Sequence, residues 1–250
     1  MNWKLIIILN GLFLFGIFEQ LFPFFIYKQK WTSRVTANFT VGILNSILTN
    51  LFLASLLGWV WHQKLWLGLF HAIQPTWLVG ILSILILDFY RYRWHVLMHK
   101  LPLAWKFHRV HHSDQTLNIS TAYRLHPFEV MLSYIPLVFL ILLFGMNPVY
   151  IGIYEIVFSL ELIFHHSNYA LPLKLDRFLS YFIITPNMHR FHHSQIVEET
   201  DSNFGSLFSI WDRLFGTICY RRNSHSIKLG LIEERRQLNI LDLLTLPFGG

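Results

Sequence analysis

The chain is dominated by long, almost uncharged apolar runs that alternate with short polar segments. These runs cover about residues 5–27, 37–60, 77–94, 131–145 and 149–164. Because roughly 20 apolar residues in a helix cross the hydrocarbon core of a bilayer, the first three runs predict membrane-spanning helices. The last two runs are shorter, and the turn-forming sequence Gly145-Met146-Asn147-Pro148 separates them. They predict a hairpin that either just spans the membrane or dips into it.

The composition agrees with a bilayer as the solvent for much of the surface. Of the 250 residues, 54% are hydrophobic and 14% are charged, against roughly 25% charged residues in a typical soluble domain. A cleaved signal peptide is the alternative for the first run, but that run is long and has no small-residue cleavage site before Lys28. We therefore expect an all-α, integral-membrane, multi-pass bundle of about four to five membrane helices or hairpin arms, forming one domain over residues 1–250.

The positive charges indicate how this bundle is oriented. Basic residues follow the first and third runs and recur throughout residues 165–236, whereas the segment between the second and third runs contains only Lys64. Lysine and arginine beside membrane spans mark the cytoplasmic side, so the net charge of +6 does not indicate a nucleic-acid partner. The same orientation predicts a cytosolic helical cap formed by about residues 95–130 and 165–250.

The strongest chemical signal is a set of histidine clusters within this predicted cap. The only cysteine is Cys219, so a metal site would depend on histidine or carboxylate ligands. Residues four apart share one face of a helix, which allows two imidazoles to bind one ion. The clusters are His95-x3-His99, His108-x2-His111-His112, His165-His166 and His189-x2-His192-His193.

The spacing within the clusters favours two metal ions over one. Adjacent helical residues diverge by about 100°, so His111 and His112 suit different ions, as do His192 and His193. Nine or ten histidines are also too many for one six-coordinate ion. Imidazole binds several first-row metals, and with no thiolate present we expect oxygen activation on iron. We interpret His62, His71 and His225 as ordinary histidines, and Asp88 as a carboxylate that orients His95 or His99.

These motifs together resemble the fatty acid hydroxylase/sterol desaturase superfamily, which includes sterol desaturases, sterol methyl oxidases, sphingolipid fatty acid hydroxylases and alkylglycerol monooxygenase. The resemblance covers about half of the chain and is specific for the superfamily but not for one member. It rests on His95-Val-Leu-Met-His99, His108-Arg-Val-His111-His112, Arg124-Leu-His126-Pro127-Phe-Glu129, His166-Ser-Asn168, Thr185-Pro186-Asn-Met-His189-Arg-Phe-His192-His193, Asn203-Phe204-Gly205 and Trp211-Asp212-Arg213-Leu-Phe215-Gly216-Thr217.

The resemblance implies roles for particular residues. The remaining ligand is either His165 or His166, and spacing does not choose between them; some relatives have a further histidine where this chain has Glu161. His126 is expected behind the ligands, and Asn203 and Asp212 are expected to tie the cap together. The implied metal ligands are His95, His99, His108, His111, His112, His165 or His166, His189, His192 and His193.

The resemblance also implies an activity: O2-dependent hydroxylation or desaturation of a fatty acyl, sterol or related lipid at two iron ions. No G-x-G-x-x-G nucleotide motif occurs, so we expect an external electron donor of the ferredoxin or cytochrome b5 type, with its reductase. We expect a bacterial inner membrane with the metal site facing the cytoplasm, with the endoplasmic reticulum as the alternative. The competing hypotheses are a zinc hydrolase, a histidine-rich metal transporter and a non-catalytic lipid-binding protein.

Overall fold

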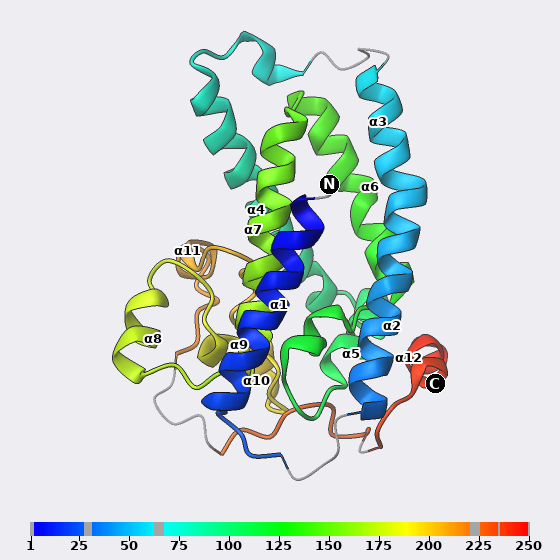
Figure 1. Ribbon diagram of the computed structural model, residues 1–250, viewed down its shortest axis with the longest axis vertical. Coiled ribbons are helices and arrows are strands. Elements are labelled where there is room, and N and C mark those ends of the chain that lie inside the picture. Colours follow the sequence, from blue (N-terminus) through cyan, green and yellow to red (C-terminus); the bar gives the residue numbers. More distant parts are fainter. Residues whose placement is uncertain (1–2, 28–31, 63–67, 221–225, 235, 250) are drawn as a thin grey trace.

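The computed structural model describes residues 3–27, 32–62, 68–220, 226–234 and 236–249. Within these ranges every regular element is a helix, and only isolated β-bridges occur, which confirms the all-α prediction. Lys28, Lys64 and His225 lie outside the described residues. The longest helices run roughly along the long axis of the molecule, and the shorter helices α5, α9, α10 and α12 gather in the lower half of the view (Figure 1).

Four stretches of the described residues are long and apolar enough to cross a membrane. They are α1 (Trp3–Leu21), residues Ser33–His62, α6 (Pro127–Phe144) and α7 (Pro148–His166). The second of these comprises α2 (Thr32–Thr49), a π-helical turn (Asn50–Ala54) and α3 (Ser55–His62). The third predicted span forms α4 (Thr76–Lys100) but is not among the four, and charged residues interrupt its apolar run. Its crossing of the bilayer stays a prediction.

One predicted helix boundary shifts for a local reason, and one predicted break between helices is observed. The first helix ends at Leu21 rather than near residue 27, because proline disfavours helical geometry at the residue before it and Pro23 follows closely. The predicted break between the last two runs is confirmed. Gly145 adopts a φ of 62°, and the side chain of Asn147 caps α7 by accepting a hydrogen bond from the backbone of Val149.

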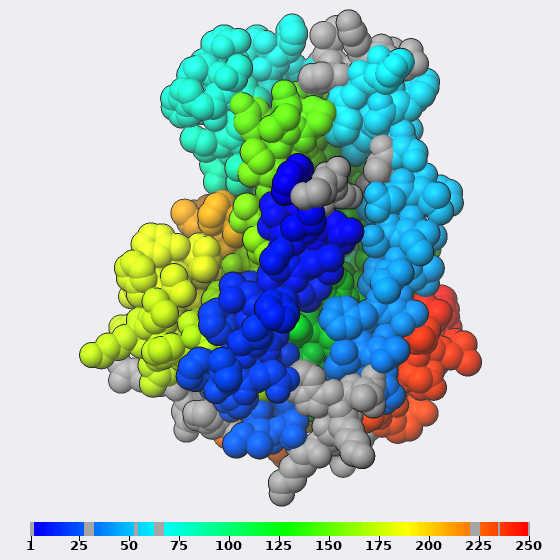
Figure 2. Space-filling view, in the orientation of Figure 1, coloured from blue at the N-terminus to red at the C-terminus, as the bar shows by residue number. Residues whose placement is uncertain are grey.

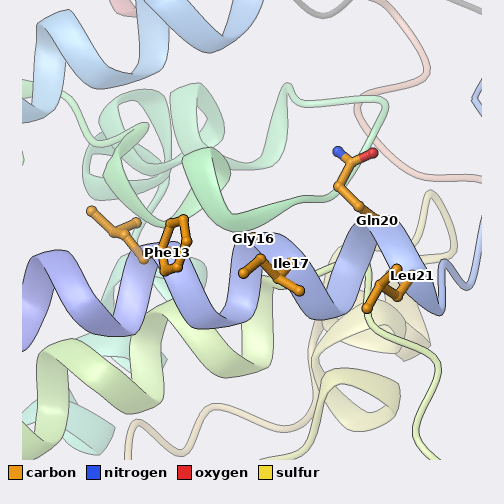
Figure 3. A pocket seen from close by; sticks show the side chains of 6 residues that line it. Phe13, Gly16, Ile17, Gln20 and Leu21 are labelled. Atoms are coloured by element: carbon orange, nitrogen blue, oxygen red, sulfur yellow. The ribbon is translucent and has the colours of Figure 1, made fainter.

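Much of the apolar surface of α1 faces outward, as expected for contact with lipid. The side chains of Phe13 and Leu21 are 71% and 64% exposed, and Figure 2 shows α1 on the surface of the molecule. A shallow hollow of about 510 Å³ follows this surface, and none of its lining residues is a histidine (Figure 3). Apolar surface of this extent is favourable only in a bilayer or against another protein.

The core that positions the helices with the clustered histidines lies between α4, α6 and α7. Leu87 and Tyr90 of α4 pack with Leu137 of α6 and Tyr154 of α7 in one buried apolar cluster. Arg91 of α4 also forms an ion pair with Glu155 of α7, with 3.2 Å between the side-chain nitrogen and oxygen. These contacts hold α4 and α7 side by side, so their lower ends reach the same region of the molecule.

Polar contacts attach the cap to the spans. The cap contains α5 (Pro102–His112), a 3-10 helix (Ile119–Tyr123), α8 (Leu173–Leu179), α9 (Pro186–His192), α10 (Val197–Thr200), α11 (Ile210–Leu214) and α12 (Ile240–Thr245). Arg34 of α2 pairs with Asp114 at 3.0 Å, and Arg124 donates to the side chain of Asn38 at 2.9 Å. The buried charges of Arg34 and Asp114 are thus paired, and that of Arg124 is hydrogen-bonded, as burial requires.

Candidate metal centre

Four separate helices bring the clustered histidines together. The lower end of α4 supplies His95 and His99, and α5 supplies three histidines within one and a half turns. The last residue of α7 is His166, and α9 contributes His189 and His192, with His193 directly after it. Helix α9 begins where the Thr185 side chain caps Met188 and Pro186 takes the first helical position, which fixes its start despite its short length.

The histidines form two groups whose ring nitrogens converge. In each group, one nitrogen from every residue lies within 4.8 Å of the others. The five-histidine group consists of His95, His99, His108, His112 and His192, and the four-histidine group consists of His111, His166, His189 and His193.

The split follows the helical spacing predicted from the sequence. In α5, His108 and His112 join the five-histidine group, while His111 points into the other group. The second H-x-x-H-H motif is divided in the opposite sense, with His189 and His193 in the four-histidine group and His192 in the five-histidine group. The structure therefore places adjacent histidines in different groups, and their binding to two different metal ions stays a prediction.

The four-histidine group has a geometry that neutral imidazoles alone do not explain. The Nε2 atom of His166 lies 3.0 Å from that of His111 and 2.9 Å from that of His189. The Nε2 atom of His189 lies a further 3.1 Å from that of His193. One ring nitrogen has either one proton or one lone pair, so it cannot donate to one neighbour and accept from another. A shared cation satisfies all four nitrogens at once.

In the five-histidine group the outer hydrogen bonds fix the tautomers. The Nδ1 atoms of His95 and His192 lie 2.9 and 2.8 Å from the backbone oxygens of Phe204 and Ser202. A carbonyl only accepts, so Nδ1 holds the proton and Nε2 presents its lone pair to the group. The Nε2 atoms of all five residues are buried and have no hydrogen-bond partner among the described residues. These orphaned nitrogens fit a bound metal ion.

Burial keeps five of the histidines in the cap neutral. Loss of solvent, and then the neighbouring histidines, hold the pKa values well below the ordinary histidine value in the cap residues His111, His112, His189, His192 and His193. A metal binds the neutral ring, so a buried cluster of this kind is already in the ligating state near neutral pH. The donors are imidazoles alone, which suits iron, zinc, copper or nickel.

Asp88 and Asp212 support the loop behind the five-histidine group. Asp88 accepts hydrogen bonds from the backbone of Leu207 and Phe208 and from the Trp211 indole. Asp212 accepts from the backbone of Phe204 and from Gly205. The prediction that Asp88 orients His95 or His99 is wrong, because the Nδ1 atoms of these histidines face Phe204 and Asp201 instead. The carboxylate of Asp88 is occupied by the three donors of the loop.

Two other predicted residues lie behind the groups rather than in them. His126 caps α6 by accepting from the backbone of Phe128, and its Nε2 lies 3.2 Å from the backbone oxygen of Leu244. It therefore connects α6 to the C-terminal segment and does not orient a ligand. Asn203 donates to the backbone oxygens of Met188 and Cys219 and so joins α9, which contains Met188, to the segment after α11.

Of the adjacent pair at the end of α7, only His166 belongs to a group. The Nδ1 of His165 lies 4.0 Å from Glu161, and its ring contacts that of His189. The ring of His166 is fixed by a contact of 2.7 Å between its Nδ1 and the backbone oxygen of Leu162. His165 and Glu161 are thus buried neighbours of the four-histidine group.

Sequence reasoning missed two carboxylates that contact rings of the five-histidine group. Glu129 lies 2.7 Å from the Nδ1 of His108, and Asp201 lies 3.3 Å from the Nδ1 of His99. Glu129 was visible as part of the motif that begins at Arg124, three residues after His126. Nothing in the local sequence distinguishes Asp201 from its acidic neighbours Glu198 and Glu199.

Fold and site together define an integral membrane protein with two clusters of buried histidines that suit a metal centre. Residues 80–217 match the family described as fatty acid hydroxylase, and because this is more than half of the chain, the protein belongs to that family.

Individual relatives agree with this family assignment. An ornithine lipid hydroxylase of Rhizobium tropici is 27% identical over 249 residues, which cover 92% of this chain and 71% of that protein. Alkylglycerol monooxygenase of Danio rerio is 30% identical over 64% of this chain, and a fatty acid hydroxylase of Lecanicillium is 30% identical over 71%. The chain spans 34% and 48% of these two relatives. No solved structure matches the chain.

Proposed function

We propose that the protein is an O2-dependent lipid hydroxylase that binds two iron ions, one in each histidine group. The observation that carries the proposal is the convergence of nine histidine nitrogens into two adjacent groups at the lower end of the membrane helices. The ornithine lipid hydroxylase of Rhizobium tropici, which matches 92% of the chain, supports a lipid substrate and hydroxylation in preference to desaturation.

The reaction converts a C–H bond of the lipid into C–OH. One oxygen atom of O2 enters the product, and the other leaves as water after uptake of two electrons and two protons. When bound, the iron ions would supply the activation of O2, as cofactors supply the difficult chemistry in other enzymes. The protein itself contributes binding, orientation and exclusion of water.

The chain's own residues perform these tasks through the hydrogen bonds described above. The oxygens of Phe204, Ser202 and Glu129 hold three rings of the five-histidine group with their Nε2 atoms directed inward. Fixed orientation of this kind preorganises a metal site before substrate arrives. The burial of the surrounding side chains excludes bulk water from the reacting C–H bond.

The position of the site suits a substrate that arrives from the bilayer. His95 and His99 lie near the lower end of α4, and His166 ends the candidate span α7. We propose that an acyl or sterol-like chain lies among the spans with its polar end at the cap. The cap then faces the cytoplasm, because basic residues such as Arg34 and Arg190 lie at this end of the molecule.

Electrons would come from outside the chain. We propose an electron carrier of the ferredoxin or cytochrome b5 type that docks on the cytoplasmic cap with its reductase. A bacterial inner membrane is the favoured location, supported by the ornithine lipid hydroxylase of Rhizobium tropici.

The test is mass spectrometry of lipids from cells that express the parent chain under isotopically heavy O2. We expect a lipid that has gained one heavy oxygen atom and that is absent in cells expressing the His189→Ala/His193→Ala variant. The Glu198→Gln variant, altered at an exposed cap residue, is the control and should form the product. Identical lipid profiles for the parent and the double variant, with both proteins present in the membrane, would reject the proposed activity.

A further inference from the structure

The two histidine groups differ in what surrounds them. In the five-histidine group, four of the five rings have an oxygen acceptor at Nδ1. Two of these acceptors are the backbone oxygens of Phe204 and Ser202, and the other two are carboxylates. Glu129 lies 2.7 Å from His108, and Asp201 lies 3.3 Å from His99.

The four-histidine group has far less support of this kind. The Nδ1 atoms of His111, His189 and His193 are buried and have no hydrogen-bond partner among the described residues. Only His166 has an acceptor there, the backbone oxygen of Leu162 at 2.7 Å. No carboxylate among the described residues forms a hydrogen bond to a ring of this group.

These differences bear directly on metal affinity. A hydrogen bond from the outer nitrogen fixes the ring and makes the inner nitrogen a stronger donor, and loss of such a partner typically lowers metal affinity by about 10–100-fold. A carboxylate also places negative charge near the cation, an effect that is strong where solvent is excluded. In addition, an ion bound by five histidines has fewer open coordination positions for a competing ligand than an ion bound by four histidines.

We infer that the two metal positions are unequal: the five-histidine group binds a divalent ion first and retains it, whereas the four-histidine group binds the second ion more weakly and exchanges it. This inference rests on the proposed metal centre. Glu129 and Asp201 act as positioning residues, since each reaches the ion only through a histidine ring.

The test follows the loss of metal from the full-length protein in detergent. Metal-free protein is reloaded with cobalt(II), an excess of chelator is added, and cobalt per chain is followed with the cobalt absorption spectrum. We expect two ions per chain that leave in two phases of equal size, with rates that differ by at least about tenfold. In the His193→Ala variant the fast phase should disappear.

Matched glutamate variants assign the slow phase. Glu129→Gln keeps the side-chain shape but removes the charge beside His108, and should accelerate the slow phase about tenfold without changing the fast phase. Glu161→Gln is the control, because Glu161 is also a buried glutamate but its nearest histidine, His165, belongs to neither group. It should leave the slow phase unchanged. If Glu129→Gln does not fold, the rate of the slow phase is measured in Asp201→Asn, which alters a partly exposed carboxylate.

The outcomes separate this inference from the proposed function. Two ions that leave at a single rate, or a Glu129→Gln variant that accelerates only the fast ion, would overturn the inequality while leaving the metal centre intact. Failure of the parent protein to bind stoichiometric cobalt would overturn both.

Discussion

The Nδ1 atom of His95 lies 2.9 Å from the backbone oxygen of Phe204, although the two residues are 109 positions apart in the sequence. The residues just before Phe204 serve two more ligands: Ser202 faces His192, and Asp201 faces His99. Asn203, between Ser202 and Phe204, has a φ of 52°, a conformation that asparagine tolerates better than most residues. A segment of four residues thus orients three rings of the five-histidine group.

The Asp212→Asn variant tests whether this segment depends on its carboxylate support. One oxygen of Asp212 accepts from Phe204 and Thr217, and the other accepts from Gly205 at 2.8 Å. An amide would present N–H to one of these donors, at a cost of about 1–3 kcal/mol. For a chain of this size we expect a melting temperature lower by roughly 2–12 °C, measured by thermal unfolding in detergent. Glu198→Gln is the exposed control, and equal melting temperatures for the two variants would contradict this account.

A second variant, Asp88→Asn, should act on the same loop from the α4 side. The carboxylate of Asp88 accepts from Leu207, Phe208 and Trp211, so its amide also leaves a buried donor unpaired. Because Asp88 and Asp212 hold one loop, the loss of melting temperature in the double variant should be smaller than the sum of the single losses. Strict additivity would show that the two carboxylates support independent parts of the cap.

The adjacent histidines at the end of α7 allow the metal content of two neighbouring alanine variants to be compared. His166 belongs to the four-histidine group and His165 does not. We therefore expect His166→Ala to lose about one metal ion per chain and His165→Ala to retain about two. Plasma mass spectrometry of both purified variants provides the measurement. Loss of an ion in His165→Ala alone would show that the wrong neighbour has been assigned as the ligand.

The helices and most of the converging histidines could be predicted because they depend on local periodicity. Long apolar runs predicted the spans, and the divergence of adjacent helical residues predicted that His111 and His112 would separate. The choice between His165 and His166 could not be made in this way, because it depends on the rotation of α7. That rotation is fixed by packing against α1, where Phe15 contacts Phe164 and Gly11 lies against Leu160.

The partners behind the ligands were also beyond local reasoning. Asp88 has a helical spacing that suggests a contact with His95, but the loop that contains Leu207 and Phe208 lies against it instead. The oxygen of Phe204 is a backbone atom, and no sequence pattern identifies which carbonyl will face a ring. Such contacts between distant segments follow only from the folded arrangement.

The buried arginine between the spans and the cap leads to a prediction about stability. Arg124 donates from Nε to the backbone oxygen of Val110 and from its terminal nitrogens to Ser113 and Asn38. Lysine cannot reproduce this planar set of donors. We expect the Arg124→Lys substitution to lower the free energy of unfolding by about 2–4 kcal/mol. The measurement is the melting temperature, which should fall clearly. Arg236→Lys is the control, because the Arg236 side chain is 71% exposed; an equal effect of both substitutions would contradict the prediction.

The iron content per chain shows most directly whether the nine converging histidines hold two iron ions. The protein is purified in detergent from iron-supplemented cells, and its metals are quantified by plasma mass spectrometry beside the His189→Ala/His193→Ala variant. We predict about two iron ions per chain in the parent and a clear loss in the variant. Parent protein without stoichiometric iron would contradict this prediction.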